Sequence, residues 1–211
     1  MPFPGKIRSL LSEYRNFELV WGAMRLILRR MQVVFQTKKQ IEAFRKKLPE
    51  LLCPRCGAAH TLVRHGYRRR FRTPTDYRIC AWRIRCKPRA NGSGCGHTPS
   101  IRLGDCIPYR YFTSKQLWAF IRTLPKAPSI KAAWERIGSP LWLDTAYRLH
   151  RRLILCQSAL RTAWCARAPP PKIKAGTPLF QVFAHLKEVF GSRNPISAYQ
   201  VAFQKSFLAM V

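Results

Sequence analysis

Acidic residues are scarce in this sequence. There are 9 Asp and Glu against 39 Lys and Arg in 211 residues, which gives a formal net charge of +30. A nuclease core that holds two metal ions needs about three converging carboxylates. The nine acids lie singly along the chain, and no group of them has the spacing of such a site. We therefore expect no enzymatic activity and no small-molecule substrate.

The sequence also lacks an uninterrupted apolar run of about 20 residues, the length that a membrane-spanning helix needs. The most apolar stretch near the N-terminus, residues 17–35, is broken by Glu18, Arg25, Arg29 and Arg30. No secretory signal is evident either, so we expect a cytoplasmic, nucleoid-associated protein. In that reducing compartment the eight cysteines are thiols or metal ligands rather than a disulfide framework.

What the chain does contain is enough apolar sequence for a core and a large excess of positive charge. It is 47% hydrophobic and 12% aromatic, which distinguishes it from a disordered polycation. A folded chain this basic is stabilised by a polyanion, and nucleic acid is the usual one. An anionic membrane surface is the alternative polyanion.

Hydrophobic periodicity predicts an α+β fold. An amphipathic helix is expected over residues 6–48, either packed on its own domain or pairing two chains. Residues 53–108 are β-rich, with strands in "TLVRHGYRRRFR", "YRICAWRIRC" and "SIRLGDCIPY", and "TPTD" between the first two is a turn. The expected divisions are 1–50, a zinc-ribbon module at 51–110, a helical domain at 111–165, a linker at 166–178 and two C-terminal helices at 179–211.

Three helices are expected in the 111–165 domain, at roughly 114–124, 129–138 and 144–157. Thr113 or Ser114 is predicted to cap the first, Ser129 the second and Asp144 the third. Gly138 lies between the second and third helices, as in a helix-turn-helix. A plain three-helix core domain with a basic face is the alternative.

The cysteine spacing predicts a metal site. Two thiolates about one tight turn apart can reach one Zn²⁺ ion, and a glycine after the second lets the chain turn back. "CPRCG" has this form at Cys53 and Cys56, and "GCG" at Cys95 resembles a second half-site. We predict a four-thiolate structural zinc site from Cys53, Cys56, Cys86 and Cys95.

The second pair departs from the usual spacing, because the eight residues "KPRANGSG" separate Cys86 from Cys95. We interpret them as an inserted surface loop and keep His97 as a rival ligand to Cys86. A redox Cys-x-x-Cys would open a helix in an α/β pattern, which is missing here. A pair without metal is the remaining alternative. Cys80, Cys106, Cys156 and Cys165 are expected to be core thiols.

Positive charge is concentrated beside the cysteines. From Arg64 to Arg89 there are ten Lys or Arg and one acid, Asp76. Arginines pair with phosphates, whereas the interleaved aromatics, Tyr67, Phe71, Tyr77 and Trp82, are expected in the core. The third helix could lie in a major groove. The candidate nucleic-acid-binding residues are Arg64, Arg68, Arg69, Arg70, Arg72, Thr145, Arg148, Arg151 and Arg152.

Residues 50–157 resemble the zinc-ribbon and helix-turn-helix DNA-binding region of bacterial insertion-sequence transposases and their small accessory proteins. The paired cysteines and "TAYRLHRRL" carry this resemblance. It implies binding to double-stranded DNA at transposon ends or a related site, with a transposase or a second copy of the chain as the candidate protein partner. The catalytic acid triad of a transposase is missing, so the resemblance implies an accessory binder, a transcriptional regulator or a truncated remnant of a transposase.

Three other functions stay open. An RNA- or ribosome-associated zinc-ribbon protein would use the same arginine-rich strand without a recognition helix. A nuclease would need carboxylates that the sequence lacks. A membrane-surface or dimerisation protein would depend on residues 6–48.

Overall fold

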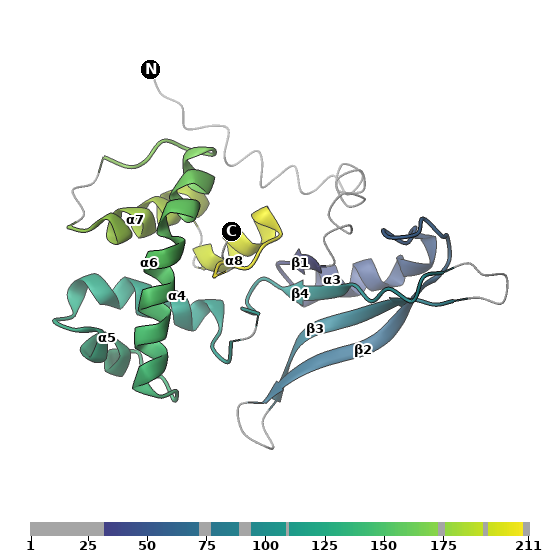
Figure 1. Ribbon diagram of the computed structural model, residues 1–211, viewed down its shortest axis with the longest axis horizontal. Coiled ribbons are helices and arrows are strands. Elements are labelled where there is room, and N and C mark those ends of the chain that lie inside the picture. The colour runs from purple at the N-terminus through teal and green to yellow at the C-terminus, as the bar shows by residue number, and fades with distance from the viewer. Residues whose placement is uncertain are drawn as a thin grey trace. The chain divides into compact units, whose positions relative to one another are not determined.

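The computed structural model describes residues 32–71, 77–88, 94–108, 110–172, 176–191 and 194–208 (Figure 1). Residues 6–31 of the helix expected over 6–48 lie outside these ranges, as do Arg72 and the turn at 73–76. The chain divides into two compact units. Of the described residues, the first unit holds those within 32–33, 41–68 and 81–102, and the second holds those within 34–40, 69–80 and 103–208. The five successive divisions expected from the sequence stay a prediction.

Four strands form one sheet: β1 (Gln32–Phe35), β2 (Leu62–Phe71), β3 (Tyr77–Cys86) and β4 (Ser100–Leu103). Their order is β1-β4-β3-β2, so β2 lies at an edge. β3 and β4 are antiparallel, with Trp82 opposite Ile101. The three strands expected from the sequence are confirmed, and together with the helices they give the expected α+β class.

β1 corrects the expectation of one continuous helix through residue 48. Val33 and Val34 are β-branched and both buried, which favours a strand with two covered faces. The helix α3 (Lys38–Lys46) then begins anew at a capping box. The Thr37 hydroxyl accepts from the Gln40 amide, and the Gln40 side chain accepts from the amides of Gln36 and Thr37. A 3-10 turn, η1 (Leu48–Glu50), follows.

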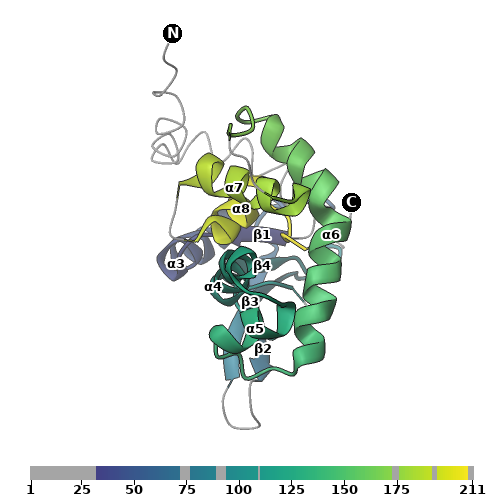
Figure 2. The same cartoon turned by 90° about the vertical axis from the view of Figure 1, so that its left-hand side faces the viewer.

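The described residues between 110 and 208 form five α-helices. They are α4 (Ser114–Thr123), α5 (Ile130–Arg136), α6 (Leu143–Cys165), α7 (Pro178–Phe190) and α8 (Pro195–Phe203), with a 3-10 turn η2 (Leu124–Lys126) after α4. α6 runs along one side of the other four (Figure 2). α8 ends at Phe203, so the last expected helix is shorter than its apolar pattern indicated.

Two of the three expected helix caps are confirmed. Thr113 and Gln116 make a capping box at α4, and the Ser129 hydroxyl accepts from the Ala132 amide at α5. Asp144 was wrong as the cap of α6, because that helix begins one residue earlier, at Leu143. Asp144 instead lies in the first turn, where its carboxylate pairs with Arg148 at 2.7 Å.

Trp164 lies at the centre of the helical core and is completely buried. Its ring is stacked on Phe207 at a centroid distance of 6.5 Å and meets His185 and Tyr199 edge-on. Leu149, Leu153 and other inward residues of α6 join the same apolar cluster. These contacts join α6 to α7, α8 and the C-terminal segment.

Replacing Leu153 by Ala is expected to lower the free energy of unfolding by about 2–5 kcal/mol, because a cavity remains in the core. The matched control is Ile154→Ala: Leu153 is 0% exposed and Ile154 43% exposed. The exposed change is expected to stay within about 0.5 kcal/mol. Urea unfolding followed by circular dichroism measures both, and equal losses would contradict the packing of α6.

Candidate metal centre

The first half of the cysteine centre is a tight turn at Cys53–Gly57. The Gly57 amide donates to the Cys53 carbonyl at 2.8 Å, and the Cys53 amide donates to the Ala58 carbonyl at 2.9 Å. Gly57 has a φ of +73°, a left-handed conformation that favours glycine. The turn therefore points the Cys53 and Cys56 side chains to the same place.

The second half joins the end of β3 to the residues around Cys95. The Cys86 amide donates to the His97 carbonyl at 2.8 Å, and the Gly96 amide donates to the Cys86 carbonyl at 3.0 Å. Gly94 has a φ of +94°, and a Cβ there would lie 2.2 Å from the Lys87 carbonyl oxygen. Cys86 and Cys95 therefore come together despite their wide spacing, because the chain at Gly94 passes so close to the Lys87 backbone that only glycine fits there.

The four sulfurs converge. All of them lie within 4.8 Å of one another, and both the Cys53–Cys95 and the Cys56–Cys86 Sγ distances are 3.7 Å. A tetrahedral zinc ion with Zn–S bonds of about 2.3 Å sets its sulfurs about 3.8 Å apart. Four thiolates are also the soft donor set that zinc prefers to calcium or magnesium. The cluster therefore fits a metal ion such as zinc, with every ligand supplied by the protein.

Two neighbouring groups tune the sulfurs. A hydrogen bond from the Ala58 backbone lowers the pKa of Cys56 to about 7, whereas burial raises the pKa of Cys53 to about 12. The Thr61 hydroxyl lies 3.2 Å from the Cys86 sulfur. In this structure the Cys86 thiol donates to that hydroxyl, and the hydroxyl donates to the Ala58 carbonyl at 3.1 Å, so both bonds orient the sulfur as outer-sphere partners of metal ligands do.

The predicted convergence of the four cysteines is confirmed, and the structural zinc site stays a prediction. Cys53, Cys56, Cys86 and Cys95 come together, and His97 contributes its backbone carbonyl to the turn while its ring is not in the sulfur cluster. Cys80, Cys106 and Cys156 are buried, as expected of core thiols. Cys165 is exposed, so its assignment to the core was wrong. It is the last residue of α6 and falls on the solvent side of that turn.

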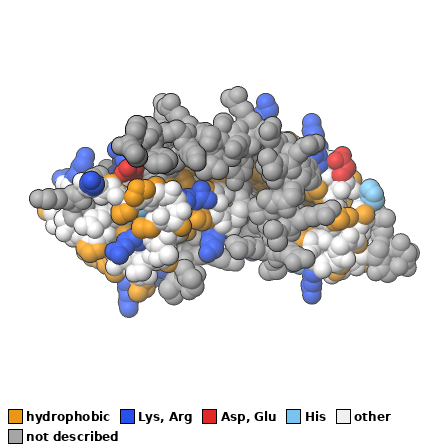
Figure 3. All heavy atoms as spheres, turned by 90° about the horizontal axis from the view of Figure 1, so that it is seen from above, with side chains coloured by type: hydrophobic (Ala, Val, Ile, Leu, Met, Phe, Trp, Pro, Cys, Tyr) orange, Lys and Arg blue, Asp and Glu red, His pale blue; other side chains and the backbone are white. Residues whose placement is uncertain are grey.

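The candidate nucleic-acid-binding arginines of β2 are mostly exposed. Arg64, Arg68 and Arg69 lie on the surface, and the Arg69 guanidinium covers the Tyr77 ring at 4.5 Å. Arg70 is half-buried and donates to the Arg110 carbonyl. Figure 3 shows Lys and Arg at many places on the described part of the face in view, with few acids.

The aromatics of this segment divide between core and surface. Trp82 is buried as expected, but Tyr67 and Tyr77 are exposed, so their assignment to the core was wrong. Tyr67 lies on the edge strand β2, and Tyr77 is the first residue of β3, where the sheet covers less of each ring.

The candidate residues of α6 differ in their surroundings. Arg148 and Arg151 are exposed, and Thr145 is half-buried. Arg152 donates from its Nε to the Leu208 carbonyl at 3.1 Å, which ties it to the C-terminal segment of its own chain. Arg152 is therefore engaged in intramolecular packing in this structure.

Two features escaped the sequence interpretation. Trp142, at the start of α6, is 87% exposed, although a tryptophan in an apolar "PLWL" stretch usually indicates burial. Cys80 and Cys106 line one pocket with Arg78, although nothing in their spacing pairs them. Neither feature can be predicted from the local sequence, because exposure and proximity depend on how distant segments of the chain pack.

No known protein family, curated protein or solved structure matches the chain. Among the described helices, none has the length and apolarity needed to cross a membrane.

The purified chain is expected to bind one zinc ion. Cys53→Ser should abolish this binding and lower the melting temperature. Losing a ligand from a structural zinc site removes binding energy that is also folding energy. Cys165→Ser is the control, because this exposed thiol lies outside the cluster. Elemental analysis and thermal unfolding measure both effects, and full zinc content in Cys53→Ser would exclude the assigned site.

The zinc affinity is expected to rise with pH across the neutral range. A thiol must lose its proton before its sulfur binds metal. Burial raises the pKa of Cys53 to about 12, whereas the pKa of Cys56 is about 7. In the metal-free chain Cys53 therefore stays protonated to a higher pH than Cys56 does. Competition with a chromophoric chelator at about pH 6.5 and about pH 8.5 should give tighter binding at the higher value. A pH-independent affinity would argue against thiolate ligation.

Proposed function

We propose that this chain is a non-catalytic, zinc-stabilised protein that binds double-stranded DNA, as an accessory or regulatory factor of a mobile element. We use the name β module for strands β2, β3 and β4 together with the four-cysteine centre. The observation that carries the proposal is the run of exposed arginines on β2, within this module. The resemblance of residues 50–157 to transposase DNA-binding regions supplies the mobile-element part. A transposase or a second copy of the chain is the proposed protein partner.

The β2 arginines are proposed to contact phosphates. Arg64, Arg68 and Arg69 project from an edge strand in a segment with almost no neutralising acids. Each phosphate that an arginine neutralises releases condensed counterions, so such contacts give affinity that falls with salt. They position the protein on the duplex without reading its sequence. The zinc centre would hold the β module that presents them.

The N-terminal half of α6 is proposed to read bases. Arg148 and Arg151 are exposed one turn apart, and Asp144 holds the Arg148 guanidinium at 2.7 Å. An arginine can make two hydrogen bonds to the edge of guanine in the major groove. Thr145 lies on the same part of the helix, whereas Arg152 already bonds to Leu208 and is a weaker candidate. The exposed Trp142 can pack against a sugar or a base at the entrance to this helix.

An RNA-binding function is the second candidate, and the exposed tyrosines favour it. Tyr67 is 48% exposed and Tyr77 is 45% exposed, both on the arginine-rich strands. Aromatic rings beside arginines can stack on the unpaired bases of single-stranded RNA. Such binding needs no recognition helix, so substitutions in α6 would leave it unchanged.

Selection from a random duplex-DNA pool tests the proposal. At physiological salt, with zinc present, a defined motif is expected to be enriched, and a zinc chelator is expected to abolish it. Purely electrostatic binding would enrich no sequence and would weaken steeply with salt. Enrichment of structured RNA from a parallel pool, with no DNA motif, would favour the second candidate.

Three single substitutions distinguish the proposed roles. Arg148→Ala should relax base preference at one position by about 1–3 kcal/mol, whereas Arg68→Ala should weaken all duplexes alike and reduce the salt slope by about 1. Arg161→Ala is the matched control, because Arg161 is exposed further along α6. Unchanged specificity in Arg148→Ala would refute base reading by this helix.

A further inference from the structure

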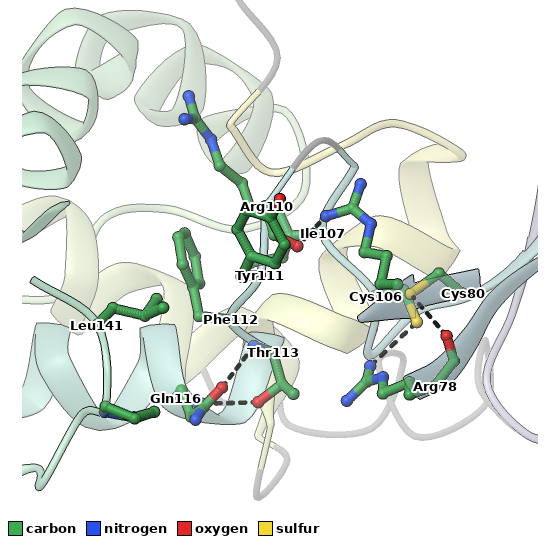
Figure 4. Close-up of a pocket in the computed structure, with 12 residues that line it drawn as sticks. Arg78, Cys80, Cys106, Ile107, Arg110, Tyr111, Phe112, Thr113, Gln116 and Leu141 are labelled. Carbon is green, nitrogen blue, oxygen red and sulfur yellow. Dashed lines mark hydrogen bonds between the residues drawn. The ribbon is translucent and has the colours of Figure 1, made fainter. Parts of the chain in front are cut away.

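A second group of cysteines lies outside the zinc-type cluster. Cys80 on β3 and Cys106, shortly before α4, are both only 6% exposed. Both line a pocket of about 230 Å³ with Arg70, Arg78, Tyr111 and Gln116 (Figure 4). Since a water molecule occupies about 30 Å³ of liquid, this pocket has room for a small polar reagent beside the sulfurs.

Arg78 is held against one of the two sulfurs. Its Nη2 lies 3.0 Å from the Cys106 Sγ, and the same nitrogen lies 3.3 Å from the Asp105 carbonyl and 3.4 Å from the Asp105 carboxylate. Asp105 is itself fixed by the Ser114 hydroxyl at 2.7 Å. These contacts fix the guanidinium, so a positive charge faces the Cys106 sulfur.

The two thiols are not equivalent. A hydrogen bond from Cys80 and, against the opposing effect of burial, one from Arg78 lower the pKa of Cys106 to about 6. The same hydrogen bond and burial raise the pKa of Cys80. The two shifts favour the thiolate form of Cys106 and the protonated form of Cys80.

We propose that Cys106 and Cys80 are a peroxide-reactive dithiol, in which Cys106 is the attacking sulfur, Cys80 is the resolving thiol and Arg78 positions the thiolate. A positively charged neighbour, a second thiol lining the same pocket and the pocket itself are the features of cysteines that oxidise selectively. This reactivity depends only on residues of the second compact unit and does not rest on DNA binding. Hydrogen peroxide is the oxidant.

The chemistry balances in two steps. The Cys106 thiolate attacks one oxygen of hydrogen peroxide, the O–O bond breaks, and the departing hydroxide takes up a proton to become water. Cys106 is then a sulfenic acid. The Cys80 sulfur loses its proton and attacks the Cys106 sulfur, the S–O bond breaks, and the hydroxyl leaves with that proton as water. The two thiols lose two electrons, and one peroxide becomes two waters.

The sequence makes the products easy to assign. Trypsin places Cys80 in Ile79–Arg83 and Cys106 in Leu103–Arg110, and each of the other cysteines falls in a different peptide. The zinc-loaded full-length chain is treated with limiting hydrogen peroxide at neutral pH, alkylated and digested without reductant. The expected first product is the disulfide between these two peptides, formed about fivefold faster than oxidation of the exposed Cys165.

Variants test the roles of the three residues. In Cys80→Ser the sulfenic acid on Cys106 is expected to persist and to be trapped by a cyclic diketone. Arg78→Met should slow oxidation of Cys106 about fivefold, whereas Arg83→Met, the matched loss of an exposed arginine on the same strand, should not. Circular dichroism and zinc content show whether each variant is folded.

Two results would overturn the proposal. One is oxidation of Cys165 or of the metal ligands while Cys106 stays reduced. The other is the absence of any diketone adduct on Cys106 in a folded Cys80→Ser chain. Neither result bears on the selection of duplex DNA, so failure here is distinguishable from failure of the proposed function.

Discussion

The meeting of four cysteine sulfurs is the constraint on which the β module depends. The turn at Cys53 and the segment around Cys95 are far apart in sequence. The described apolar core of this unit is smaller than that of the helical part and contains Val33, Ile41, Phe44, Leu48, Leu51, Leu62, Trp82, Ile84 and Ile101. A small core leaves little net stability after the chain entropy is lost. Ligation of one metal ion by both segments would supply what the core lacks, because binding energy at a structural site is folding energy.

The positive charge imposes a second constraint. The described acids form few ion pairs, and those of Glu42, Asp105, Glu135 and Asp144 lie at the surface or only partly buried. Exposed pairs of this kind contribute about 0–1 kcal/mol each. The net charge of +30 is therefore not offset within the chain, and β2 and α6 carry eight of its 39 Lys and Arg residues. A polyanion would relieve this repulsion, which gives the proposed ligand a physical reason beyond resemblance.

Sequence reasoning succeeded where the chemistry is local. The Cys53 turn, the cap at Thr113 and the cap at Ser129 are all set by residues a few positions apart. Even the wide spacing before Cys95 was interpretable, because a loop can be inserted between ligands without moving them. It failed where tertiary packing decides: periodicity assigned residues 32–35 to a helix, yet the successive residues Val33 and Val34 are both buried in a strand. Likewise, no spacing rule links Cys80 to Cys106, which meet only through the fold.

The two cysteine groups show why burial alone does not define a thiol. Cys86 and Cys106 are both buried. Cys86, however, faces three other sulfurs and the Thr61 hydroxyl, and the four sulfurs are a ligand set that can bind a metal cation. Cys106 faces one thiol and the fixed guanidinium of Arg78, so its negative charge is already balanced by the protein. A sulfur whose charge is balanced by a metal has little tendency to attack a peroxide, whereas one balanced by an arginine beside a pocket stays nucleophilic. The same residue type is therefore structural at one place and reactive at the other because of the cation that each sulfur faces.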